Sequence, residues 1–169
     1  MALTQPKSLG ILLLMRVMAL DFGSKAIGVA LSDELQLAAR PLTTLRRNQL
    51  KFAKVLERIT TLVTEHEVGI LVVGLPLNMD GTRGSAASRV ESFVVELKRY
   101  VGIPVVMLDE RLTSFEAEQL LREMGVGERE RRARSDEYAA LLILRDYLDS
   151  LEYKRSRKAA LSTLLERKL

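Results

Sequence analysis

The sequence predicts one α/β domain built on a mixed five-stranded sheet, with helices on both faces of the sheet. Three short apolar segments near the N-terminus, separated by polar or glycine-containing turns, predict an antiparallel meander. Helical and apolar-strand patterns then alternate from residue 48 to residue 151, which is typical of parallel strands joined by right-handed crossovers. At 169 residues and 47% hydrophobic content, the chain is long enough for one core and too short for two ordinary domains.

The meander is predicted from residues 15–21, 27–31 and 37–45. The first two runs are apolar and flank a turn that contains a glycine, so they predict a hairpin. Pro41 falls in the third run and cannot donate a ladder hydrogen bond, which places that run at a bend or at the edge of the sheet. Three antiparallel strands are therefore expected before the first helix.

The remaining elements follow from hydrophobic spacing. Apolar residues recur at helical spacing from about residue 48 to residue 66, which predicts a helix. The apolar run at 70–73 is bounded by glycines, as expected for a central strand that is covered on both faces. The elements expected after it are a helix at 85–100, a strand at 102–109, a helix at 114–124, an arginine-rich solvated loop at 129–134 and a helix at 135–151.

Composition restricts the available chemistry. The chain has no cysteine, which excludes disulfides, thiol nucleophiles and cysteine-bearing zinc sites. Its one histidine, His66, is predicted at a helix end, where a contact with the helix dipole is expected rather than catalysis. No run reaches the roughly 18 apolar residues of a membrane span, and Arg16 interrupts the apolar start of the chain. We expect a cytoplasmic protein without a membrane partner, whose chemistry depends on carboxylates, cations and hydroxyls.

Charge is distributed unevenly along the chain. The net charge is +4, and residues 153–169 alone carry six Lys or Arg and one Glu, a local balance of +5. We therefore expect a flexible extension at 1–14, the folded domain at 15–152 and a basic tail at 153–169. Such a tail either gathers phosphates by counterion release or is merely solvated, and the sequence leaves both interpretations open.

Acidic residues stand at three element ends: Asp21 after the first strand, Asp109 and Glu110 after the last, and Asp136 at the start of the final helix. Sites gather at the carboxyl ends of parallel strands, so these acids converge if the first strand is central and parallel to the later two. Clustered carboxylates suit Mg²⁺ or Mn²⁺, and two such ions about 4 Å apart hydrolyse phosphodiesters. Each acid also has a structural interpretation: a bond to turn amides, an ion pair with an arginine, or a helix N-terminus.

Two loops offer further candidates. Lys25 with Ser24 in the hairpin turn either contacts a phosphate or forms an ordinary polar turn. The loop after the central strand contains Asn78 and Arg83, and loops at that position commonly contact substrate.

Four segments resemble, in order and spacing, the bacterial YqgF family: 21–30, 73–81, 109–113 and 136–140. The resemblance covers about residues 15 to 151. It implies a ribonuclease H-like fold related to the RuvC Holliday-junction resolvases, and a cytoplasmic nuclease that matures the 5′ end of pre-16S ribosomal RNA. The family usually has arginine where this chain has Ala26, which weakens the case for a phosphate-gripping turn.

The resemblance also implies roles for individual residues. The metal-binding catalytic acids would be Asp21, Glu110 and Asp136, with Asp109 as a supporting neighbour or as the inward-facing member of its pair. The implied substrate-binding or supporting residues are Lys25, Asn78, Arg83, Arg111 and Thr113.

The leading hypothesis is a Mg²⁺- or Mn²⁺-dependent nuclease that acts on structured RNA, with ribosomal precursor particles as partners and either a monomeric or a homodimeric state. One alternative is a resolvase acting on branched DNA, and another is a non-catalytic RNA- or ribosome-binding factor. A further alternative takes the first hairpin as the phosphate loop of an actin-like or sugar-kinase ATPase. Such ATPases need two such lobes, and this chain supplies one.

Overall fold

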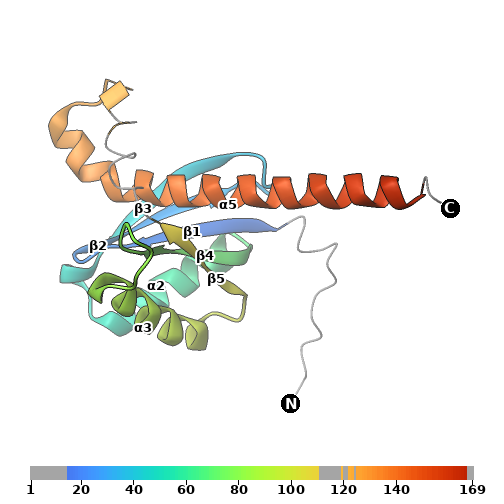
Figure 1. Cartoon of the computed structure of the whole chain (residues 1–169). Coiled ribbons are helices and arrows are strands. Elements are labelled where there is room, and N and C mark those ends of the chain that lie inside the picture. The colour runs from blue at the N-terminus through green and yellow to red at the C-terminus, as the bar shows by residue number, and fades with distance from the viewer. Residues whose placement is uncertain (1–14, 111–118, 120–121, 124, 167–169) are drawn as a thin grey trace, which may run out of the picture.

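The computed structural model describes residues 15–110, 119, 122–123 and 125–166, and it contains one five-stranded sheet in the order β3-β2-β1-β4-β5 (Figure 1). The strands are β1 (Arg16–Phe22), β2 (Ala26–Ser32), β3 (Ala39–Arg46), β4 (Val68–Pro76) and β5 (Val105–Glu110). The helices are the 3₁₀ turn η1 (Arg47–Gln49), α2 (Phe52–Glu65), α3 (Ser85–Tyr100) and α5 (Glu128–Glu166).

The sheet is mixed, as predicted. Strands β1, β2 and β3 form the antiparallel meander, whereas β4 runs parallel to both β1 and β5. Because β1 is central and parallel to β4 and β5, the carboxyl ends of these three strands lie at the same edge of the sheet. Pro41 lies in the edge strand β3 opposite Ala30, where the register shifts, so the ladder accommodates the missing donor.

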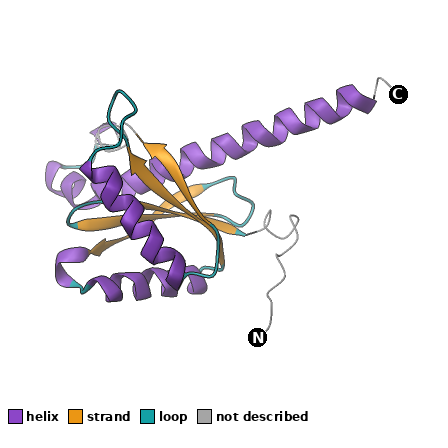
Figure 2. Cartoon of the chain, turned by 60° about the horizontal axis from the view of Figure 1, so that its bottom comes forward, coloured by secondary structure: helices purple, strands orange, loops and turns teal. Residues whose placement is uncertain are grey.

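Helices cover both faces of the sheet (Figures 1 and 2). Residues of β1 alternate between the two cores: Val17 and Ala19 pack against α5, whereas Met18 and Leu20 pack against α2 and α3. The face under α5 is lined by small residues such as Ala19 and Ala30, which lets this helix approach the strands closely. None of the helices in the described part of the chain has an apolar stretch long enough to cross a membrane.

Helix α5 is longer than predicted at both ends. The prediction of a loop at 129–134 is wrong, because the helix already begins at Glu128. It continues to Glu166, through much of the expected basic tail. No glycine or proline interrupts this stretch, and Glu130 pairs with Arg134 at 3.3 Å across one helical turn. The helix expected at 114–124 lies mostly outside the described residues.

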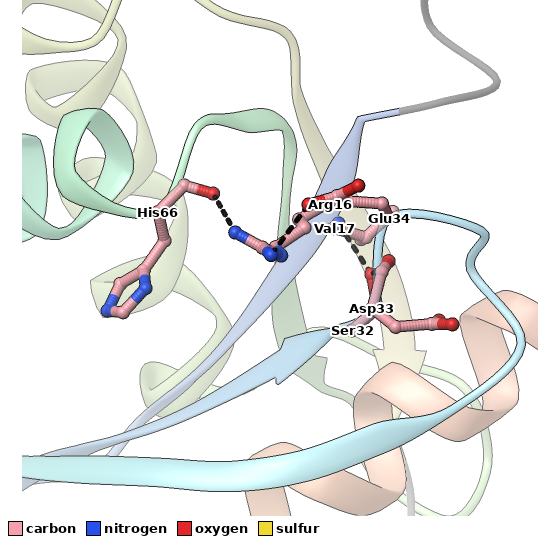
Figure 3. Close-up of polar contacts among 6 residues, drawn as sticks. All are labelled: Arg16, Val17, Ser32, Asp33, Glu34 and His66. Atoms are coloured by element: carbon pink, nitrogen blue, oxygen red, sulfur yellow. Dashed lines mark hydrogen bonds and ion pairs between the residues drawn. The ribbon is translucent and has the colours of Figure 1, made fainter.

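Polar contacts fasten the amino end of β1 (Figure 3). The Arg16 guanidinium donates to the carbonyl of His66 at 3.2 Å and pairs with Glu34 at 2.8 Å. The Ser32 hydroxyl accepts the Val17 N–H at 2.8 Å and donates to the Asp33 carbonyl at 2.8 Å. His66 ends α2 at this edge, opposite the carboxyl end of β1 where Asp21 lies.

We expect Ser32→Ala to lower the free energy of unfolding by about 1–3 kcal/mol, because it leaves the buried N–H of Val17 without an acceptor. Chemical denaturation measures this loss. Ser24→Ala, in the exposed hairpin turn, is the matched control and is expected to change stability by less than about 0.5 kcal/mol. Equal stability of the two variants would contradict the assignment.

Candidate active site

Asp21 lies near the carboxyl end of β1, on the face that α5 covers. Its Cα is paired with Gly28 of β2, and the alternation of β1 places it with Val17 and Ala19 rather than with the α2–α3 core. Burial, together with the nearby carboxylate of Asp136, raises the pKa of Asp21 to about 7. The structure therefore brings two of the three predicted acids together.

Gly28 determines how closely α5 approaches this point. A Cβ at position 28 would overlap the backbone carbonyl of Asp136 and would lie 3.0 Å from the nitrogen of Glu137. The backbone of α5 thus contacts β2 directly at Gly28, which is the Cα partner of Asp21. Gly28 was not among the predicted site residues, although a glycine inside an apolar strand is a known sign of close backbone approach.

Two residues of β3 interact with Asp136 and Glu137 of α5. The Thr44 hydroxyl donates to the Glu137 carboxylate at 3.2 Å, and Thr44 is the Cα partner of Gly28. Burial raises the pKa of Asp136, while the positive charge of Arg46 opposes that rise. Arg46 therefore places a positive charge near Asp136, and Thr44 links β3 to α5 by a hydrogen bond.

Glu110 ends β5, where its Cα is paired with Pro76 of β4, and its side chain is not among those described. Strand β4 separates β5 from β1, and Glu110 lies two residues beyond the level of Asp21, so their backbones are about 12 Å apart. Asp109 is exposed and is paired with Leu75, which belongs to the α2–α3 core. Among the described side chains, no three acidic or histidine groups are close enough together to hold a metal ion.

Lys25 lies exposed in the turn between β1 and β2, at the same edge as Asp21. Arg47 makes two hydrogen bonds to this turn. Its guanidinium donates to the carbonyl oxygen of Gly23 at 2.7 Å, and its backbone N–H donates to the carbonyl oxygen of Lys25 at 2.8 Å. Sequence reasoning missed Arg47. The available signal was the Arg46–Arg47 pair at the end of the third strand.

The loop after β4 is organised by its own side chains. The Asn78 amide donates to the Thr82 hydroxyl at 2.8 Å, and that hydroxyl donates to Asp80 at 2.6 Å. Arg83 pairs with Glu91 of α3 at 2.8 Å. These contacts shape the loop and direct Arg83 toward α3 rather than toward the acids. The other two predicted substrate residues, Arg111 and Thr113, lie outside the described residues.

Comparisons with known proteins show which family the chain belongs to. The family model of RuvX, described as Holliday junction resolvase, matches residues 15–150. A protein named "Putative pre-16S rRNA nuclease" from Roseiflexus sp. (strain RS-1) is 49% identical over 135 residues, which cover 80% of this chain and 94% of the relative. Its namesake from Halalkalibacterium halodurans is 45% identical over 140 residues, or 83% of this chain and 100% of that one.

Among solved structures, the fowlpox virus resolvase in complex with Holliday junction DNA covers 81% of this chain and 99% of its own, with a TM-score of 0.50 and 13% identity. That likeness concerns the fold alone. The sheet order, the helices on both faces and this likeness define a ribonuclease H-like protein, as predicted. The chain belongs to the RuvX family, which is the YqgF family of the sequence analysis.

Proposed function

We propose that this protein is a divalent-metal-dependent nuclease that acts on structured RNA in the cytoplasm, in 5′-end maturation of pre-16S ribosomal RNA within precursor particles. The observation that carries the proposal is that the carboxylates of Asp21 and Asp136 lie close to each other, at the carboxyl edge of the parallel strands. The names of the 45–49% identical relatives support the choice of substrate.

The residues present fit Mg²⁺ or Mn²⁺. Two partly buried carboxylates with raised pKa values are costly in the metal-free protein, and a bound cation relieves both their burial and their repulsion. Both divalent ions prefer oxygen ligands of this kind.

We assign the third carboxylate to Glu110 rather than to Asp109. Strand periodicity assigns position 110 to the face of Leu108, which packs against α5, whereas position 109 shares the face of Leu75. Glutamate is also one methylene longer than aspartate, which suits a ligand supplied from the strand farther from Asp21.

The chain's own residues would divide the work as follows. Two bound divalent ions would supply activation of water and stabilisation of the leaving oxygen. Asp21, Asp136 and Glu110 would hold these ions, and Arg46 favours the ionised form of Asp136. The exposed ammonium of Lys25, at the same edge, binds a phosphate oxygen of the substrate backbone.

A second candidate is cleavage of branched DNA, which is favoured by the description of the family model as a Holliday junction resolvase. A precursor 16S RNA with its 5′ extension and a four-way DNA junction, each incubated with Mg²⁺, Mn²⁺ or chelator, test both candidates. We expect metal-dependent cleavage of the RNA. Cleavage of the junction alone would favour the resolvase. Salt-sensitive RNA binding without turnover of either substrate would favour a non-catalytic binding factor and overturn the proposal.

Asp136→Asn is expected to lower the cleavage rate by about 100-fold, because it removes a charged ligand of the metal. The matched control is Asp149→Asn, which changes an exposed aspartate farther along the same helix. Cleavage rates under single-turnover conditions distinguish them. Equal rates for the two variants would show that Asp136 holds no metal during turnover.

A further inference from the structure

A groove lies close to Asp21 but on the opposite face of the sheet. Phe22 follows Asp21 in β1 and therefore points toward α2 and α3. The groove has a volume of about 380 Å³, within the usual range of ligand pockets. We call it the Phe–Arg groove, and it is lined by Phe22, Arg47, Phe52, Ser88, Arg89, Ser92, Phe93 and Glu96.

Aromatic rings form the apolar part of the Phe–Arg groove. Three of the chain's four phenylalanines meet there. The rings of Phe22 and Phe93 stack with centroids 4.2 Å apart, and Phe52 meets Phe93 edge-on at 6.4 Å. Phe93 is buried, whereas Phe52 is 44% exposed. Phe52 thus presents aromatic surface to solvent at the first turn of α2.

Two arginines form the charged part of the groove. The Arg47 guanidinium lies 4.1 Å from the centroid of the Phe22 ring, and its bond to Gly23 fixes it there. Burial and the nearby charge of Arg89 both lower the pKa of Arg47, so the two cations lie within each other's field. Arg89 makes no ion pair within the described residues. The acid of the groove, Glu96, is paired with Arg99 at 3.0 Å.

We propose that the Phe–Arg groove binds one nucleotide of a single-stranded segment of the substrate, with the base stacked on the exposed ring of Phe52 and its phosphate between Arg47 and Arg89. Every base has a π-face, so such stacking tolerates any sequence, and a guanidinium binds phosphate oxygens in a bidentate manner. A paired base inside a duplex cannot enter the groove. This inference rests on the proposed function only in that the substrate is a nucleic acid.

Position relative to the acids gives the groove a role in substrate choice. Asp21 and Phe22 are consecutive, so the catalytic acids and the groove occupy the two faces of one strand end. A nucleic-acid strand that passes over this edge of the sheet meets both. The groove thus selects substrates in which the nucleotides beside the scissile phosphate are unpaired.

The test measures binding without cleavage. Fluorescence anisotropy in chelator, with a mixed-sequence single-stranded RNA and with the duplex of the same sequence, compares the wild type with Phe52→Ala, Phe52→Tyr, Arg89→Ala and Lys98→Ala. Lys98 is an exposed cation of α3 outside the groove, so Lys98→Ala matches the charge change of Arg89→Ala.

We expect Phe52→Ala to weaken single-strand binding by about tenfold and Phe52→Tyr to restore it to within about twofold of wild type. Arg89→Ala is expected to lower the slope of log affinity against log salt by about one, and Lys98→Ala by less. Duplex binding is expected to change less than single-strand binding in Phe52→Ala. Unchanged single-strand binding in both groove variants, or an equal loss for duplex, would overturn the inference.

The outcome is separable from that of the proposed function. Wild-type protein that binds single strands through the groove but cleaves nothing with Mg²⁺ or Mn²⁺ would retain the groove and refute the nuclease. Metal-dependent cleavage with no effect of Phe52→Ala or Arg89→Ala on single-strand binding would retain the nuclease and refute the groove.

Discussion

Asp21→Asn is expected to reduce metal-dependent cleavage by about 1,000-fold or more and, at the same time, to raise the melting temperature of the metal-free protein. The loss of activity follows from removing a metal ligand. The gain in stability follows because a partly buried carboxylate beside Asp136 becomes a neutral amide of the same shape. A substitution in a residue with only a structural role would not combine these two effects.

The titration of Asp21 determines how the free energy of unfolding of the wild type changes with pH. The pKa of Asp21 is about 7 in the folded protein, against about 3.9 in an unfolded chain. Between these values the unfolded chain has lost the proton while the folded protein keeps it, so the free energy of unfolding falls as pH rises from about 4 to 7. Above pH 7 the penalty is complete and constant.

The asparagine variant lacks this titration, so its advantage over the wild type grows between about pH 4 and pH 7 and then levels off. We expect a gain on the order of 2 kcal/mol at pH 7.5 and a rise in melting temperature of about 4–8 °C. Mn²⁺ is expected to raise the melting temperature of the wild type and of the Asp149→Asn control, and not that of Asp21→Asn. A variant that is less stable than wild type at pH 7.5, or that still responds to Mn²⁺, would refute the role of Asp21.

Gly28→Ala is expected to lower the free energy of unfolding by about 3 kcal/mol, because the new methyl group overlaps the backbone of Asp136. The helix must move away from β2, and a shift of about 1 Å at the site is enough to lower the cleavage rate by about 100-fold. Urea denaturation measures the first effect, and single-turnover cleavage by the folded fraction measures the second.

The matched control is Gly102→Ala, since a Cβ at position 102 would meet no atom within 4 Å. We expect this variant to keep both its stability and its cleavage rate. If Gly28→Ala unfolds at the same urea concentration as Gly102→Ala, then the contact between α5 and β2 does not set the position of Asp136.

Much of the fold follows from sequence periodicity. The five strands, and their division into an antiparallel meander and two parallel strands, could be predicted from apolar alternation and crossover rules, whereas the central position of β1 was left as a condition. Helix α5 could not be delimited in this way, since the charged run at 129–134 has the composition of a solvated loop and equally that of an exposed helix. Its Glu130–Arg134 pair becomes evident only once the helix is formed.

The candidate site was predictable where it depends on the ends of strands. The sequence made the convergence of the acids conditional on a central first strand parallel to the later ones; β1 has that position, and Asp136 lies near Asp21. The importance of Gly28 and Arg47 was missed, since each depends on contact with a backbone that the sequence does not place. The roles of Glu110, Lys25 and the residues at 111–113 stay predictions.

The contact between Gly28 and α5 also has a consequence for the timing of synthesis. Asp21 leaves the ribosome early, whereas Asp136 is among the last parts of the domain to be made, and at about 5–20 residues per second the interval is on the order of 10 s. During that interval the face of β2 that contains Gly28 is not covered by α5, and Asp21 does not yet have Asp136 as a neighbour. A nascent chain therefore carries no assembled site, and the two acids meet only after nearly the whole domain has been translated.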